Sequence, residues 1–227
     1  MKLEDLLPQI YETVAGSYEA VACPEYERLI RKMMRKATVS TQPRLVHMGG
    51  IPGAGKTTFT RRYNMKNMVY IGFDAVMEEI SGYQDDIRVF GPEEGFKKWE
   101  MTARIIGYEL LRRSIEMRAD IFFDHSGCFA AHIDLIRNIR RYGYTTDMYF
   151  ILCDIDTAYQ RALQREEWTM RHTPREMIEE RAGLAEKYLQ TYRTIVDNFY
   201  LYDTSSGKFS LVEERHNLHP EELSAAG

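Results

Sequence analysis

Cysteine is scarce in this sequence, with 3 among 227 residues. The three thiols, Cys23, Cys128 and Cys153, form no CxxC pair and no Cys/His spacing of a zinc site. Such a set is typical of reduced thiols and excludes a disulfide framework or a structural zinc centre. We therefore expect a protein of a reducing compartment, the cytoplasm.

Long apolar stretches and an excess of basic charge are also missing. No apolar run approaches the about 20 residues of a membrane-spanning helix. Glu4, Asp5 and Pro8 interrupt the apolar residues at the start of the sequence, which excludes a secretory signal. With Lys+Arg 30 against Asp+Glu 34, the formal net charge is −4. Neither a membrane nor bulk nucleic acid is therefore an expected partner.

The arrangement of apolar segments predicts an α/β fold. Helical segments separate most of the short apolar strands, and strands that are apolar on both faces favour a parallel sheet covered by helices on both sides. We predict a three-layer α/β/α sandwich of the P-loop NTPase type, with a mostly parallel sheet and a C-terminal edge hairpin. A helical N-terminal extension, residues 1–43, precedes the main domain, residues 44–227. Strands are expected at 44–48, 68–73, 121–123, 148–152, 199–202 and 209–212, and helices at 3–14, 24–36, 93–118, 130–142, 156–166 and 174–195.

The sharpest local feature is a complete GxxxxGK[ST] motif between a predicted strand and a predicted helix, the context that the motif requires. Its glycines allow backbone N–H groups to converge on phosphate oxygens, and the helix start adds its positive dipole end. Lys56 is expected to contact the β- and γ-phosphates, and the Thr57 hydroxyl to bind Mg²⁺. The sequence therefore predicts a site for ATP and Mg²⁺ lined by Gly50, Pro52, Gly53, Ala54, Gly55, Lys56, Thr57 and Thr58.

Several classes of protein share this motif. Asp124-His125-Ser126-Gly127 satisfies the DxxG pattern of a GTPase, but the chain has no N/TKxD guanine reader. No predicted strand ends in the Asp-Glu of a mechanochemical ATPase. A small-molecule kinase needs a catalytic base, a carboxylate near Mg²⁺ and arginines that neutralise the transferred phosphoryl group. Residues for each role are present, so a kinase is favoured.

Two aspartates follow predicted strands. Asp74 ends the stretch VYIGFD and Asp124 ends IFFD, so both are expected at the ligand-binding edge of a parallel sheet. Asp74 suits a general base that binds the acceptor; the alternative is a helix cap for the segment that follows. Asp124 suits a ligand of Mg²⁺ or of an acceptor hydroxyl; the alternative is a turn residue.

Arginines are concentrated after the fourth strand. The segment Glu166–His172 is expected to form a lid between two helices, the second capped by Thr173, and a guanidinium on such a lid can stabilise transition-state charge. We assign this role to Arg165 and Arg171. Ion pairs with neighbouring glutamates explain the other three arginines at least as well; these are Arg161, Arg175 and Arg181.

The motifs together resemble the zeta-toxin family of P-loop kinases, and more loosely the polynucleotide-kinase-like small kinases. The resemblance covers roughly residues 44–213, and Arg171-His172-Thr173-Pro174-Arg175 is its most family-specific part. It implies that Lys56, Asp74, Arg165 and Arg171 are catalytic and that Asp124 faces the substrate. It also implies a UDP-N-acetylamino sugar as acceptor and an antitoxin-like protein partner. The chain departs from the family at Asp124-His125-Ser126, where zeta toxins usually have Glu-Gly-Thr.

The expected activity is transfer of the γ-phosphate of ATP to a hydroxyl of a small molecule. Two alternatives stay open at this stage. A polynucleotide or nucleoside 5′-hydroxyl kinase would use the same machinery with a basic groove. A regulatory module would bind nucleotide without transferring phosphate.

Overall fold

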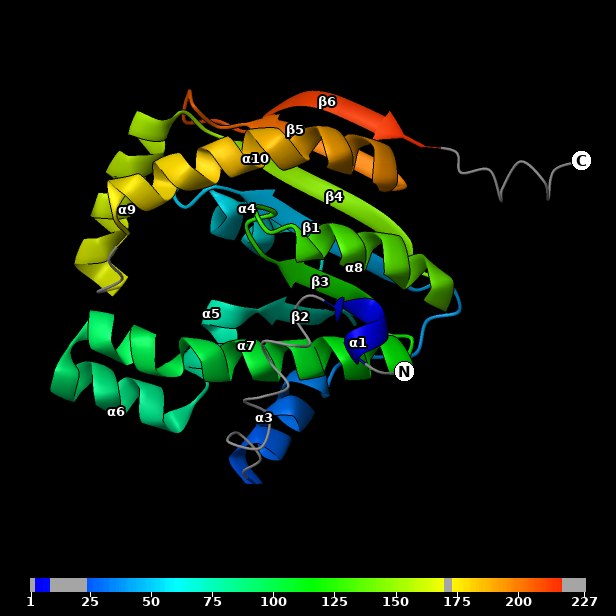
Figure 1. Cartoon of the computed structure of the whole chain (residues 1–227), viewed down its shortest axis with the longest axis horizontal. Helices are drawn as coiled ribbons and strands as arrows, with labels where there is room; N and C mark the ends of the chain where they lie inside the picture. Colours follow the sequence, from blue (N-terminus) through cyan, green and yellow to red (C-terminus); the bar gives the residue numbers. More distant parts are fainter. Residues whose placement is uncertain (1–2, 9–23, 170–172, 218–227) are drawn as a thin grey trace, which may run out of the picture.

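The computed structural model describes residues 3–8, 24–169 and 173–217, and its centre is a six-stranded sheet (Figure 1). The strand order is β2-β3-β1-β4-β5-β6. The first five strands in that order run parallel, and β6 pairs antiparallel with β5. This confirms the predicted parallel sheet with an edge hairpin. The bounds are β1 (Arg44–Gly50), β2 (Val69–Gly72), β3 (Ile121–Asp124), β4 (Thr145–Leu152), β5 (Asn198–Asp203) and β6 (Ser210–His216).

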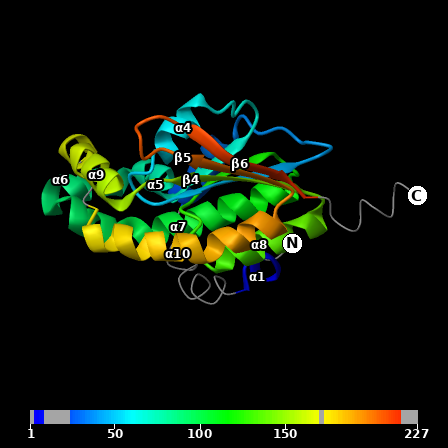
Figure 2. The same ribbon diagram turned by 90° about the horizontal axis from the view of Figure 1, so that it is seen from above.

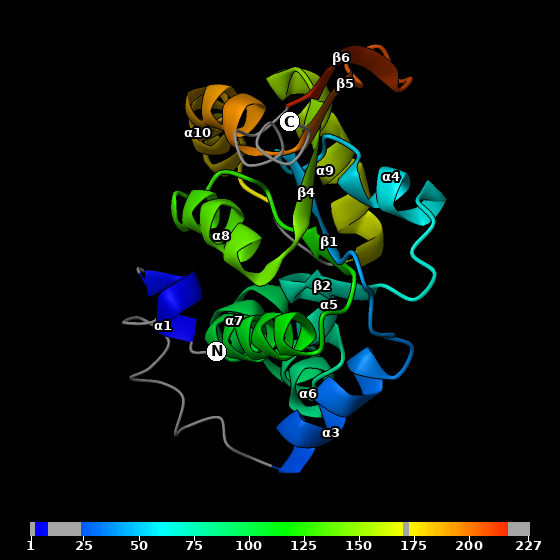
Figure 3. The ribbon, with the colours of Figure 1, turned by 90° about the vertical axis from the view of Figure 1, so that its right-hand side faces the viewer.

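Helices cover both faces of the sheet, as Figures 2 and 3 show. The long helices α7 (Pro92–Glu116), α8 (Ala131–Ile139) and α10 (Arg175–Ile195) lie on one face, and α4 (Lys56–Arg62) lies on the other. Strand residues such as Val46, Phe122 and Phe123 are fully buried because the sheet is covered on both sides. None of the described helices is long and apolar enough to cross a membrane.

The N-terminal residues add two described helices to this core. Helix α1 (Leu3–Leu6) lies beside α8, where Asn138 donates a hydrogen bond to the Leu6 carbonyl. Helix α3 (Pro24–Met34) buries Leu29 and Ile30. Most of the helix predicted over 3–14 lies outside the described residues, and the boundary at residue 43 stays a prediction.

Two helices lie between β2 and α7; the first was expected from the sequence only as an alternative, and the second was not expected. Helix α5 (Phe73–Glu78) directly follows β2, and α6 (Ser81–Phe90) packs along α7. None of the residues of α6 is buried, so this helix lies at the surface of the molecule and not in its core. Together, α6 and α7 form a hairpin that extends beyond the sheet on the side of the strands' carboxyl ends (Figure 1).

Three local predictions were wrong. Helix α9 (Ile155–Thr169) continues through most of the segment expected to form a lid loop. The N-cap of α10 is Pro174, and no side chain caps this helix. Strand β6 extends to His216, because its exposed charged half still pairs with β5.

Candidate active site

The glycine-rich loop joins β1 to α4 at the centre of the sheet. Gly53 has φ 82° and Gly55 has φ 99°, conformations that side chains with a Cβ rarely adopt. A Cβ on Gly53 would lie 2.0 Å from the carbonyl oxygen of Ala158 in α9. From the other side, the Thr204 hydroxyl donates to the Ala54 carbonyl at 2.8 Å. The loop is therefore fixed between α9 and the end of β5.

The polar groups of the motif lie at the start of α4. Lys56 Nζ donates to the carbonyl oxygens of Gly50, at 2.6 Å, and Ile51, at 3.1 Å, so the ammonium lies over the loop. Thr57 and Thr58 are exposed in the first turn. The N–H groups of that turn have no partner within the helix, which makes the helix start a favourable place for phosphate. Phosphate oxygens thus fit this loop, with Lys56 as their counter-charge.

Asp124 ends β3, as the sequence predicts. It lies level with Met48 of β1 and Gly72 of β2, so it stands at the same edge of the sheet as the loop. The Tyr70 hydroxyl donates to Asp124 Oδ2 at 2.7 Å. Burial raises the pKa of Tyr70, and the neighbouring Asp124 and Asp74 raise it further. Tyr70 therefore keeps its proton and holds the Asp124 carboxylate in place.

Asp74 is the second residue of α5 and does not end a strand. The N-cap of α5 is Gly72, without a side-chain cap, so the capping alternative for Asp74 is wrong. Its charge contributes to the raised pKa of Tyr70. Asp74 therefore lies near enough to Tyr70 for its charge to act there, whereas Asp124 is hydrogen-bonded to the same tyrosine.

All four arginines of this group that the structure describes have hydrogen-bond partners within the protein. Arg161 donates to the Thr204 hydroxyl at 3.1 Å and carbonyl at 2.7 Å, behind the glycine-rich loop. Arg165 donates to the Thr173 hydroxyl at 2.9 Å, which joins α9 to the start of α10. The exposed Arg175 pairs with Asp156 and Glu179. Arg171 lies outside the described residues.

Arg181 is joined to the glycine-rich loop through Ser126, a contact that was not predicted from the sequence. It donates to the Ser126 hydroxyl at 3.1 Å, and the Ser126 carbonyl accepts a hydrogen bond from Gly50 N at 2.8 Å. Burial raises the pKa of Cys128, whereas the charges of Arg181 and Lys56 lower it, so both cations lie near this thiol. The buried residues of α10 are Ile178, Ala185, Leu189 and Tyr192.

The spacing of Arg181 from the buried residues of α10 could have distinguished it from the surface arginines. Arg181 follows Ile178 by three positions and precedes Ala185 by four, so it lies on the buried stripe of the helix. An arginine on such a stripe needs a specific reason to be there.

The oxygen donors of the site fit Mg²⁺ that arrives with a nucleotide. Among the described residues, no three His, Cys, Asp or Glu side chains form a metal cluster. The Thr57 hydroxyl and the Asp124 carboxylate are hard oxygen ligands, and Mg²⁺ commonly binds through one or two such groups together with phosphates and water. These two residues are the candidates to hold the ion.

Solved structures show the same fold. The chain is similar to a protein of the PezAT chromosomal toxin–antitoxin system of the human pathogen Streptococcus pneumoniae, with 17% identity and a TM-score of 0.67 over 88% of this chain and 84% of that one. It is also similar to a chain of the AvrRxo1-ORF1:-ORF2 complex with ATP, with 14% identity and a TM-score of 0.62 over 89% of this chain and 70% of that one.

Sequence comparison identifies the family. No curated protein matches this sequence. The zeta toxin family, in contrast, matches residues 29–214, which include all the described strands except the last two residues of β6. Because the match spans most of the chain, this protein belongs to the zeta toxin family.

Proposed function

We propose that this protein is an ATP-dependent kinase that phosphorylates a hydroxyl group of a small molecule, with a UDP-N-acetylamino sugar as the first candidate acceptor. The family and the fold support ATP-dependent phosphotransfer in general. The observation that carries the proposal is that two carboxylates lie near Tyr70, at the sheet edge where the glycine-rich loop lies: Asp124 accepts its hydrogen bond, and Asp74 is near enough for its charge to raise the pKa of Tyr70. A nucleotide-binding module that transfers nothing has no need of two such carboxylates.

In the donor half, the loop N–H groups and Lys56 bind the β- and γ-phosphates of ATP. Lys56 leaves the carbonyl oxygens of Gly50 and Ile51, since the phosphates offer the ammonium a full opposite charge. Thr57 and Asp124 would hold Mg²⁺, which would supply charge neutralisation on the transferred phosphoryl group.

In the acceptor half, Asp74 accepts the proton of the attacking hydroxyl. Asp124 is less suited to this role, because its Oδ2 already accepts the hydrogen bond of the Tyr70 hydroxyl. Asp74 lies in the first turn of α5, two residues beyond the end of β2. The two carboxylates thus take different tasks.

Arg165 and Arg181 neutralise charge on the transferred phosphoryl group in this proposal. Arg181 lies near Lys56 and is held by Ser126, which is joined to Gly50 of the loop. Arg165 lies on α9, the helix that packs against Gly53. A role for Arg171 stays a prediction.

A protein partner of the antitoxin kind belongs to the same proposal. The similar structures are described as part of a toxin–antitoxin system and as an ORF1:ORF2 complex. A partner of this chain would be expected to control access to the nucleotide site.

The test is transfer of labelled phosphate from γ-labelled ATP. Purified protein is incubated with a UDP-N-acetylamino sugar, with nucleosides, or with oligonucleotides that carry a 5′-hydroxyl. Label on the sugar nucleotide supports the proposal, and its absence in the Lys56→Ala variant ties the activity to this site. Label on the oligonucleotide favours the polynucleotide kinase instead. Tight ATP binding without transfer to any acceptor in a metabolite extract contradicts a kinase.

A further inference from the structure

Helix α3 lies against the part of the molecule that carries Asp74. It packs beside α7 and β2, below the sheet in Figures 1 and 3. Tyr26, Leu29 and Ile30 bury their side chains there. These contacts hold α3 in place. Charged residues near both of its ends form ion pairs with α7 and with the end of α5.

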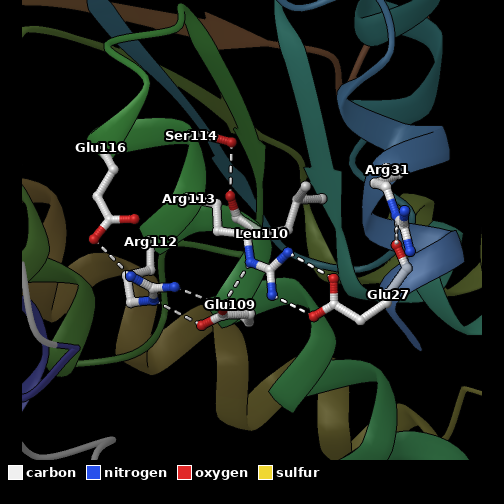
Figure 4. Close-up of polar contacts among 8 residues, drawn as sticks. All are labelled: Glu27, Arg31, Glu109, Leu110, Arg112, Arg113, Ser114 and Glu116. Atoms are coloured by element: carbon white, nitrogen blue, oxygen red, sulfur yellow. Dashed lines mark hydrogen bonds and ion pairs between the residues drawn. The ribbon is translucent and has the colours of Figure 1, made fainter. Parts of the chain in front are cut away.

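The first link is an ion-pair network with α7, drawn in Figure 4. The Arg113 guanidinium binds both carboxylate oxygens of Glu27 and also donates to Glu109, at 2.7 Å. Glu109, whose side chain is 6% exposed, receives Arg112 as a second partner. The hydrogen bonds from Arg113 lower the pKa of Glu27. Because Glu109 is a buried charge that depends on its arginines, the geometry at this point of α7 is tightly determined.

The second link joins α3 to the end of α5. Lys32 forms an ion pair with Glu79, the residue that follows the last turn of α5. Glu27 and Lys32 lie five residues apart on α3, and each contacts a different helix. Helix α3 therefore ties α7 to α5.

Helix α7 also contacts Phe73, the residue next to Asp74. The Phe73 ring packs on Tyr108 of α7 with 4.9 Å between ring centroids, and the Arg104 guanidinium lies 5.7 Å from the centre of the same ring. Gly107 makes this contact possible, since a Cβ there would lie 2.5 Å from Phe73. The position of α7 thus fixes Phe73, and Phe73 fixes the start of α5, where Asp74 lies.

We propose that α3 is a positioning element for the acceptor half of the active site, with Glu27 and Lys32 as positioning residues that hold α5 and α7 so that Asp74 meets the acceptor hydroxyl. The inference rests on the proposed function, because it assigns α3 a part in that reaction. Glu27 precedes residue 29, where the match to the zeta toxin family begins. Glu27 therefore lies outside the matched region, whereas its partner Arg113 lies inside it.

The test reverses the charge of Lys32 in its ion pair with Glu79, and a second substitution at Glu79 then restores an ion pair of opposite orientation. Lys32→Glu is expected to reduce kcat by roughly 3- to 30-fold, since a misplacement of about 1 Å at a reacting group can cost on the order of 100-fold. ATP affinity, measured by calorimetry, should not change, because the glycine-rich loop lies on β1 and α4. Lys32→Glu combined with Glu79→Lys should recover turnover, and Glu27→Gln should lower kcat in the same way as Lys32→Glu.

Hydrogen exchange of residues 73–79 gives a second readout that does not depend on activity. It should be faster in Lys32→Glu and return to normal in the double variant. Lys187→Glu is the matched control, because Lys187 is exposed on α10 and the charge change is the same. Its turnover and exchange should equal those of the wild type.

The outcomes separate the two proposals. Unchanged turnover in Lys32→Glu and Glu27→Gln overturns the positioning role, even if the melting temperature falls. Slower turnover that the double variant does not recover also overturns it, since the pair itself is then not responsible. A wild-type protein that transfers phosphate to no acceptor contradicts the proposed function instead, and the exchange measurement still reports whether α3 holds α5.

Discussion

At the scale of single residues, the two aspartates of the site make separable predictions. Asp74→Asn keeps the shape of the side chain but cannot accept a proton. Turnover should fall by about 10²- to 10⁴-fold, the usual contribution of a general base. The melting temperature should change little, because Asp74 does not cap α5. Asp85→Asn, in an exposed ion pair on α6, serves as the control. A loss of turnover below about threefold is too small for a general base and would remove Asp74 from the mechanism.

The arginines give a second prediction at this scale. Arg165→Ala and Arg181→Ala should lower turnover more than ATP affinity, because the contact with the phosphoryl group strengthens in the transition state. A single arginine in this role can contribute about 10³- to 10⁵-fold, and less where two share the charge. Arg181→Lys should rescue only in part, since an ammonium lacks the planar donor geometry of a guanidinium.

Arg175→Ala is the internal control for that series. Its guanidinium is paired with Asp156 and Glu179 on the surface of α9 and α10, so its removal should be mild. The comparison uses one transfer assay, with ATP binding measured separately by calorimetry. If Arg175→Ala is the most damaging of the three, the assignment of Arg165 and Arg181 is wrong.

At the scale of elements, the contact between the glycine-rich loop and α9 can be tested with one methyl group. Gly53→Ala places a Cβ 2.0 Å from the Ala158 carbonyl, at φ 82°. The loop must then move, and ATP affinity should fall strongly. Gly183→Ala is the matched control, because a Cβ at Gly183 in α10 meets nothing within 4 Å. It should leave ATP binding unchanged and stabilise the helix by about 0.5–1 kcal/mol. Equal ATP affinity in both variants would contradict the conclusion that the contact with α9 holds the loop in its binding conformation.

Elements with strong local patterns could be predicted from the sequence. The four central strands are short, apolar and bounded by turn residues, and the glycine-rich motif places the nucleotide loop after β1 without further information. Asp124 follows from the same reasoning, because it directly ends β3. Helix α6 was missed although its apolar residues Tyr83, Ile87 and Phe90 recur at helical spacing, because the segment is only 10 residues long.

The errors at the site have a common physical cause, which is competition between local signals and tertiary contacts. Thr173 has the sequence of a helix cap, but its hydroxyl accepts the hydrogen bond of Arg165. Asp74 looks like the end of a strand, but β2 stops at Gly72 and the chain turns into α5. Arg181 looks like one more surface arginine in the sequence. Only its spacing from the buried residues of α10 distinguishes it from the neighbouring arginines.

At the scale of the whole molecule, three histidines lie in the layer between the sheet and the helices α7, α8 and α10. His132 packs against His125 with ring centroids 4.2 Å apart, and against His47 at 5.7 Å. Tyr108 of α7 contacts His132 Nε2 at 3.1 Å. Burial lowers the pKa of His125 and His132 well below the ordinary value, and to about 3 for His47. The folded protein therefore holds this cluster uncharged.

This cluster predicts how stability depends on pH. The unfolded chain binds a proton at His47 below about pH 6.5, whereas the folded chain does so only near pH 3. The free energy of unfolding should therefore fall as the pH drops from 6.5 towards 3, by an amount on the order of a few kcal/mol for this residue. His47→Phe keeps a ring of similar size and removes the proton site, so its urea midpoint should fall less steeply over that range. His216→Gln, at a side chain that is 61% exposed, should follow the wild type. If the urea midpoint of His47→Phe instead changes with pH in the same way as that of the wild type, the buried imidazole does not limit stability in acid.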